Sequence, residues 1–214
     1  KINSKFSDYN SEVMGNISGT AVERGRNWKK IKKEPVTVLL ILINTLIFLV
    51  VEFTGGSENG QHMLECGAAY APLILEQGQW YRLFSSMFLH FGAPHLINNM
   101  LVLFVLGQRL EPVTGKIKFF LIYYYLVVWA ENALFVFLIM YAGNASLSAG
   151  ASGAVFAVMG GMIYVIIRHR GRVADLTVRQ MLIMAAFSLY FGFASEGVDN
   201  VAHIGGLLSG FLIV

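Results

Sequence analysis

Six long apolar runs constrain this chain more than any other feature of its sequence. They cover approximately residues 36–53, 94–108, 118–142, 150–168, 180–196 and 201 to the end. Only 14 % of the 214 residues are charged, and the mean hydropathy is +0.59, whereas soluble domains have about 25 % charged residues. A helix needs about 20 apolar residues to cross about 30 Å of hydrocarbon. The sequence therefore predicts an all-α polytopic membrane protein, a bundle of six transmembrane helices.

The last apolar run is shorter than the others. It has 14 residues, fewer than a membrane span needs, and the chain begins with Lys1 rather than Met. We therefore expect a piece of a longer protein in which the sixth helix continues. Whether a seventh helix follows it stays open.

The positively charged residues predict the orientation of these helices, because cytoplasmic loops carry an excess of Lys and Arg. All Lys and Arg residues except Arg82 fall in the N-terminal tail, in the loop after the second run or in the loop after the fourth. We expect a cytoplasmic basic tail, residues 1–34, followed by a membrane domain, residues 35–214. Its external loop, residues 54–93, mixes polar and aromatic residues and predicts short amphipathic helices in the membrane interface.

The net charge of +3 needs no nucleic-acid partner to explain it. The basic run RNWKKIKK, residues 26–33, precedes the first apolar run and is typical of a juxtamembrane segment that contacts anionic lipid. The single cysteine, Cys66, excludes an internal disulfide. The lipid bilayer is the first partner that the composition predicts.

Four polar residues fall in the opening turns of helices that this orientation starts at the outer surface: His95, Asn99, Ser152 and His203. Polar groups in hydrocarbon are costly and commonly mark a functional site. At a rise of 1.5 Å per residue the four lie at nearly one depth, and His95 and Asn99 share a helix face. Because the orientation follows from other residues, this shared level predicts a site that opens to the outer face.

The types of these four residues suit acyl transfer. A serine hydroxyl becomes a nucleophile when a base takes its proton, so the pattern predicts Ser152 as nucleophile and His203 as base. The negative oxygen of a tetrahedral intermediate needs hydrogen-bond donors. Asn99 Nδ2, a His95 ring nitrogen and the Ser152 backbone N–H are the candidates.

Each of these signals also has a structural interpretation. Gly150 and Gly153 allow close backbone approach at the serine turn, but such small-residue motifs also serve helix packing in membranes. His203 lies in a glycine-rich run that suits a tightly packed helix with one hydrogen-bonded histidine, and the polar pair of the second helix can bond between helices. We interpret His90 as a hydrogen-bonded loop residue and Asp199 as a helix N-cap rather than a triad carboxylate.

The sequence resembles the rhomboid intramembrane serine proteases over most of residues 36–214. These motifs, in this order, are specific to that family, although each is weak alone. They are Tyr81-Arg82 in the first loop, HFGAPHLINN at 90–99, GASG at 150–153 and AHIGGLLSG at 202–210. The resemblance implies a rhomboid-like bundle and a multi-pass protein of a bacterial plasma membrane.

The resemblance implies a serine endopeptidase with a Ser–His dyad, Ser152 and His203, and with His95 and Asn99 stabilising the oxyanion. The implied reaction is hydrolysis of a peptide bond in or beside a transmembrane segment of a substrate protein. It requires no cofactor and no metal ion.

Further residues receive structural roles from the same resemblance. Gly206 and Gly210 match glycines that let the sixth helix pack tightly on the fourth, and Arg82 would brace the external loop. The implied gate for substrates is lateral, near the fifth helix and the cap loop around 194–200.

Two features depart from the family pattern. Phe156, one helical turn after Ser152, stands where many relatives carry a tyrosine that stacks on the histidine, so a hydroxyl is lost. Glu131 and Asn132 stand where small residues are common in the third helix. A glutamate about 20 Å from a helix start is costly unless it is protonated or paired. We expect Glu131 to face an aqueous cavity or a polar partner.

Two other functions fit part of the sequence. A catalytically inactive rhomboid-like protein that binds client helices would not need both Ser152 and His203. A transporter would show inverted repeats and broken helices, and neither is visible in the sequence. His62 and Cys66 in the external loop are spaced i, i+4, but two ligands make a weak metal site.

Overall fold

A computed structural model of the protein describes residues 34–123, 147–168, 172–173, 176–194 and 200–213. Five predicted helices lie in these residues, and all five are present. They are α3 (Pro35–Gly55), α7 (Gly92–Thr114), α9 (Ser152–Arg168), α10 (Val178–Ala194) and α11 (Asn200–Ile213). The predicted run 118–142 is helical up to residue 123 and then leaves the described residues.

Among the described helices, α3 is long and apolar enough by itself to cross a membrane. α7 also qualifies when it is counted with the preceding segment Arg82–Phe88, from which it is bent by 89°. The apolar parts of α9, α10 and α11 are shorter. The helices fit an all-α membrane protein, while the number of spans stays a prediction.

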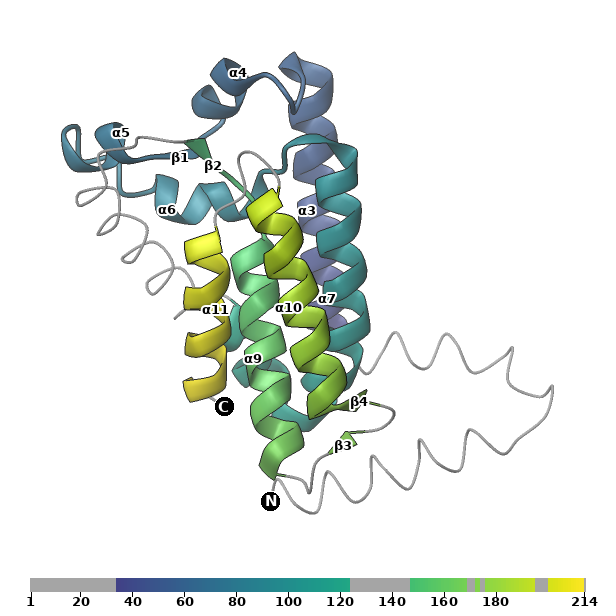
Figure 1. The fold of residues 1–214 in the computed structure, drawn as a ribbon. Helices are drawn as coiled ribbons and strands as arrows, with labels where there is room; N and C mark the ends of the chain where they lie inside the picture. Colours follow the sequence, from purple (N-terminus) through teal and green to yellow (C-terminus); the bar gives the residue numbers. More distant parts are fainter. Residues whose placement is uncertain (1–33, 124–146, 169–171, 174–175, 195–199, 214) are drawn as a thin grey trace, which may run out of the picture.

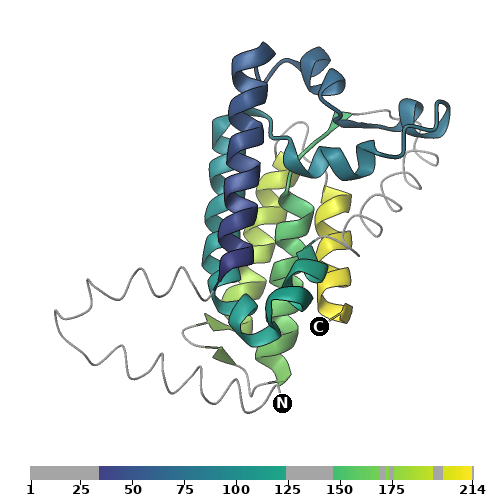
Figure 2. The same ribbon diagram turned by 180° about the vertical axis from the view of Figure 1, so that it is seen from behind.

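The helices form a bundle with α9 at its centre. α7, α10 and α11 each pack against α9, and α3 packs against α7 (Figure 1). α7, α9 and α11 begin at one end of the bundle, where the short loop helices also lie, whereas α3 and α10 run the other way (Figures 1 and 2). The fold therefore brings the first turns of α7, α9 and α11 to the same end.

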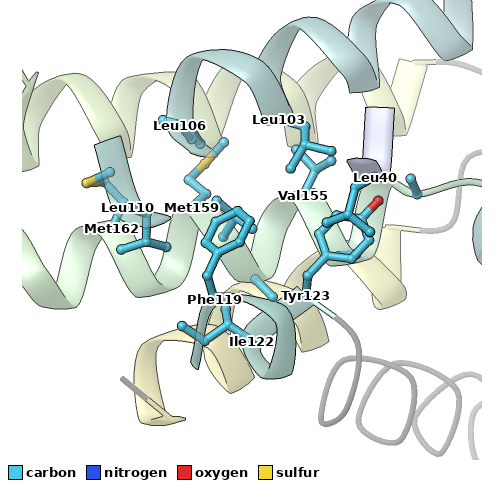
Figure 3. Packing of buried hydrophobic residues seen from close by; sticks show 14 of the residues in the cluster. Leu40, Leu103, Leu106, Leu110, Phe119, Ile122, Tyr123, Val155, Met159 and Met162 are labelled. Atoms are coloured by element: carbon cyan, nitrogen blue, oxygen red, sulfur yellow. The ribbon is translucent and has the colours of Figure 1, made fainter. Parts of the chain in front are cut away.

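The central position of α9 follows from its composition. Every residue from Gly153 to Ile163 is buried, as expected for a helix that is apolar on all sides. Leu103, Leu106 and Leu110 of α7 face Met159 and Met162 of α9 in the core (Figure 3).

The outer helix α3 is apolar on its exposed side as well. Leu42, Leu46 and Phe53 on this side are more than half exposed. In a soluble protein such a surface would mark an interaction site, and for a membrane helix it is the side that lipid covers.

Glycines set the distance between α9 and α11. A Cβ atom added to Gly160 would overlap the carbonyl oxygen of Leu207, and one added to Gly210 would overlap that of Ala157. Gly206, which lies on α11 with Gly210, is also buried. Small residues of this kind let two backbones approach closely in a membrane protein.

α7 extends further than the predicted range 94–108, because its polar last turn is bonded to α3. The buried Glu111 side chain accepts hydrogen bonds from Val36 N at 3.0 Å, Thr37 N at 2.8 Å and Thr37 Oγ1 at 2.7 Å. The first N–H groups of a helix lack partners within the helix. The carboxylate of Glu111 supplies them from a neighbouring helix.

The external loop contains short elements: α4 (Gly60–Glu65), β1 (Ala69–Tyr70), α5 (Ala71–Leu75), α6 (Arg82–Ser85) and the 3₁₀ helix η2 (Ser86–Phe88). β1 pairs antiparallel with β2 (Leu147–Ser148), which leads into α9. At the other end of the bundle, β3 (Arg172–Val173) pairs with β4 (Leu176–Thr177).

Trp80, Tyr81 and Phe84 are exposed on this loop. Exposed aromatic residues of this kind suit a membrane interface, and this placement in the membrane stays a prediction. Several other predicted features lie outside the described residues. They are the tail up to residue 33, most of the third span with Glu131 and Asn132, and the cap loop with Asp199.

Candidate active site

Ser152 is the first residue of α9 and follows a turn that the external loop holds in place. Gly150 N donates to the Ser86 carbonyl oxygen at 3.0 Å, and Ala151 N donates to His90 Nε2 at 3.3 Å. The carbonyl of Ala151 accepts the first helical hydrogen bond, from Val155 N at 2.9 Å. Ser152 thus lies at the positive end of the helix dipole, where negative charge is stabilised.

The backbone at Gly150 explains why this position is a glycine. Its φ is +148°, a conformation that side chains disfavour. An added Cβ atom would also lie 2.8 Å from His95 Cε1, 3.0 Å from His95 Nε2 and 3.5 Å from Ser152 Oγ. The His95 ring and the Ser152 hydroxyl therefore both lie against Gly150.

Asn99 lies one turn after His95 on α7 and is buried. Its Nδ2 donates to the His95 carbonyl oxygen at 3.0 Å. An amide nitrogen carries two hydrogens, so this bond leaves one for another acceptor. The role of Asn99 as an oxyanion donor stays a prediction.

His203 contacts Phe156, which lies one helical turn after Ser152. Their rings are stacked, with centroids 4.4 Å apart and planes inclined by 10°. Because Phe156 lies four residues after Ser152, it shares the serine's face of α9. The ring packing expected from the family pattern is thus formed by a phenylalanine.

The His203 ring is only 5 % exposed, and neither of its nitrogens has a hydrogen-bond partner among the described residues. His203 therefore makes no hydrogen bond to Ser152 in this structure. Catalytic hydrogen bonds are often long before substrate binds, and a catalytic role is one explanation for a buried polar group without a partner.

Arg82 is buried in the external loop and connects three of its parts. Its guanidinium donates to the carbonyl oxygens of Leu64 at 2.7 Å and Ala68 at 3.0 Å, and to Gln79 Oε1 at 2.7 Å. These contacts support the bracing role proposed for Arg82. It lies in the loop rather than among the four candidate site residues.

The described residues contain no group of three or more His, Cys, Asp or Glu side chains that could hold a metal ion. His62 Nε2 lies 3.5 Å from Cys66 Sγ and 3.1 Å from Thr54 Oγ1. Burial, and secondarily the charge of Glu65, raises the pKa of the Cys66 thiol. A thiol held protonated is a poor metal ligand and a poor nucleophile.

The sequence predicts His90 as a hydrogen-bonded loop residue but does not identify Ala151 as its partner. His90 lies in the external loop between η2 and α7 and is 1 % exposed. Burial, and secondarily the neighbouring His95, lowers the pKa of His90 to about 3. The sequence feature that could have pointed to His90 was its position five residues before His95.

Comparison with known proteins gives consistent similarities. Residues 77–214 match the profile of the family described as "Rhomboid domain". The chain is 36 % identical to Rhomboid protease GluP of Bacillus subtilis (strain 168) over 179 residues, 84 % of this chain and 34 % of GluP. It is 34 % identical to RHOMBOID-like protein 4 of Arabidopsis thaliana over 142 residues, 65 % of this chain and 34 % of that protein.

A third relative matches over more of its own length. Rhomboid protease AarA of Providencia stuartii is 28 % identical over 208 residues, 83 % of this chain and 70 % of AarA. The chain thus spans about a third of the length of GluP and of RHOMBOID-like protein 4.

Proposed function

The chain belongs to the rhomboid family, and on this premise we propose that it is an intramembrane serine protease that uses a Ser152–His203 dyad. The observation that carries the proposal is the stack of His203 on Phe156, one turn from Ser152. His203 and Phe156, which are 47 positions apart in the sequence, are in contact there near the start of the central helix.

In the proposed first step, the Ser152 oxygen attacks the carbonyl carbon of the scissile peptide bond, and His203 takes the hydroxyl proton. The intermediate then collapses: the carbon–nitrogen bond breaks, and His203 returns the proton to the leaving amine. Water repeats the attack on the acyl-enzyme with the same base. No further reactant is required.

The oxyanion of each intermediate needs donors that are already in place. The Ser152 N–H lies at the start of α9, where no residue precedes it within the helix to accept its hydrogen. The His95 ring and the serine oxygen both lie against Gly150. Asn99 Nδ2, with one hydrogen bonded to the His95 carbonyl, supplies a second side-chain donor.

The proposed substrates are transmembrane proteins, cleaved in or near a membrane-spanning segment. The candidate site lies at the end of the bundle that carries the external loop (Figure 1), and the distribution of Lys and Arg predicts that this end is outside, with a cytoplasmic N-terminus. Water thus has a short path to Ser152 from the outer face, while a substrate helix arrives from the lipid. A multi-pass protein of a bacterial plasma membrane fits these features.

The proposal is tested by labelling the detergent-purified chain with a fluorophosphonate probe, in which the serine oxygen bonds to phosphorus and fluoride leaves. We expect labelling of the parent and none of Ser152→Ala or His203→Ala. The matched controls are Ser209→Ala, whose hydroxyl donates to the Gly206 carbonyl of its own helix at 3.0 Å, and His62→Ala in the external loop. Both should be labelled like the parent.

Cleavage of a generic transmembrane substrate is measured in parallel with the labelling. It should be lost in the same two variants. A folded parent that neither reacts with the probe nor cleaves would contradict the proposal. It would favour a catalytically inactive protein that binds client helices.

A further inference from the structure

The imidazole of His90 contacts the backbone immediately before Ser152. Its Nε2 accepts the Ala151 N–H at 3.3 Å, across 61 residues of sequence. Both residues are buried: His90 is 1 % exposed and Ala151 is 0 % exposed. A buried N–H that lost this acceptor would be costly, so the turn would shift toward another partner.

This bond completes the support of the serine turn by one short segment of the external loop. The Gly150 N–H donates to the Ser86 carbonyl oxygen at 3.0 Å, and the next N–H, that of Ala151, donates to His90. The N–H that follows these two belongs to Ser152 itself. The loop thus occupies the two donors that precede the proposed oxyanion donor and fixes the plane of the peptides that lead to it.

The same imidazole also contacts the second proposed oxyanion donor. The rings of His90 and His95 pack edge to face, with centroids 5.2 Å apart and planes inclined by 70°. The His95 ring in turn lies against Gly150, as Ser152 Oγ also does. One buried ring therefore contacts both the peptide N–H that precedes Ser152 and the ring of His95.

A ring nitrogen accepts a hydrogen bond only when it carries no proton. The bond to Ala151 thus requires a neutral His90 whose proton is on Nδ1. The low pKa of His90, which follows mainly from burial, keeps the ring neutral at ordinary pH.

We propose that His90 is a positioning residue for the oxyanion site: it holds the Ser152 turn through the Ala151 N–H and orients His95 by ring packing. This inference rests on the proposed protease function and deepens it. His90 itself does not contact the reacting atoms. Its loss should therefore lower the rate of attack by Ser152 rather than the binding of a substrate helix.

The test compares His90→Gln with His90→Leu in the full chain. Gln Oε1 can reach the position of Nε2 and accept the Ala151 N–H, whereas Leu has similar bulk and no acceptor. We expect the rate constant of fluorophosphonate labelling to fall about 100-fold in His90→Leu, since small displacements in an active site cost about this much. His90→Gln should recover at least about a tenth of the parent rate, and kcat on a transmembrane substrate should fall with little change in KM.

Hydrogen exchange of the peptide that covers residues 149–155 gives a readout that does not require activity. Exchange at the Ala151 amide should be faster in His90→Leu than in the parent and should return toward the parent rate in His90→Gln. If His90→Leu does not fold, His90→Asn replaces it, because the shorter side chain cannot place its oxygen at the Nε2 position.

The outcomes separate the two proposals. An unlabelled parent contradicts the proposed protease function. The exchange measurement then still decides whether His90 holds the turn before Ser152. A labelled parent with equal labelling and equal exchange in His90→Leu overturns the positioning role alone. Equal loss in the Leu and Gln variants overturns the proposed role of the Ala151 hydrogen bond, because the ring packing on His95 would then account for the whole loss.

Discussion

The ring of His203 lies flat against the ring of Phe156, with centroids 4.4 Å apart and planes inclined by 10°. Since neither His203 nitrogen has a hydrogen-bond partner among the described residues, this stack is the contact that orients the proposed base. The phenylalanine has no hydroxyl with which to add a hydrogen bond. Orientation of the base therefore depends on ring packing.

We predict that Phe156→Leu reduces the rate of fluorophosphonate labelling about tenfold, because an aromatic pair contributes about 0.5–1.5 kcal/mol beyond its buried area. Phe156→Tyr keeps the stack and should stay near the parent rate. Phe84→Leu makes the same change at an aromatic pair of the external loop and serves as control. Parent-like labelling of Phe156→Leu would show that the stack does not orient the base.

The packing of α11 on α9 predicts a stability effect at Gly210. A methyl group there would overlap the carbonyl oxygen of Ala157, and since both helix backbones must shift, Gly210→Ala should cost about 1–3 kcal/mol or more. The control is Gly60→Ala, where the added atom lies 4.0 Å from Leu147. Thermal unfolding in detergent should show a clear loss of Tm for the first variant only. Equal Tm values would mean that α11 packs less closely on α9.

Glu111 is predicted to stabilise the contact between α7 and α3. Glu111→Ala removes the acceptor for two N–H groups and one hydroxyl, and leaving buried donors unpaired costs about 1–3 kcal/mol for each group. We expect a loss of at least about 2 kcal/mol in the free energy of unfolding, and a smaller loss for Glu111→Gln, which keeps one acceptor.

The control for Glu111 is Glu76→Ala at an exposed position of the external loop. Its effect should stay within about 0.5 kcal/mol. Denaturant unfolding of the four proteins in one detergent is the measurement. A Glu111→Ala variant as stable as Glu76→Ala would show that these hydrogen bonds do not stabilise the bundle.

Cys66 is a natural reporter of orientation, because it is the single cysteine of the chain and lies in the predicted external loop. A membrane-impermeant maleimide should label it in intact cells. Because burial raises the pKa of its thiol, less thiolate is present at a given pH than for a free thiol, so labelling should be slow near neutral pH and rise toward pH 9 and above.

The control for this labelling is Cys66→Ser combined with Lys116→Cys, which moves the thiol to an exposed position at the other end of the bundle. That variant should react only after the membrane is opened. The opposite result would reverse the predicted orientation: labelling of the Lys116→Cys variant in intact cells, and no labelling of Cys66 in the parent.

The sequence by itself determined the helices and the chemistry available to them. Apolar length alone located the five described helices to within a few residues, because a helix satisfies its own backbone within one continuous segment. The exception was the end of α7, which continues through polar residues to Thr114, beyond the predicted end at residue 108. Residue type was sufficient to single out Ser152, His203, His95 and Asn99, since the cost of polar groups in an apolar run is local information.

Only the tertiary structure decided how these groups are held. The bond between Ala151 and His90 crosses 61 residues, that between Thr37 and Glu111 crosses 74, and the stack of His203 on Phe156 joins two helices. Such contacts depend on how closely helices approach and how each is rotated, which glycines such as Gly210 set by steric exclusion. Periodicity along one helix carries no information on that distance, so the sequence provided the candidate groups and the packing of the bundle placed them.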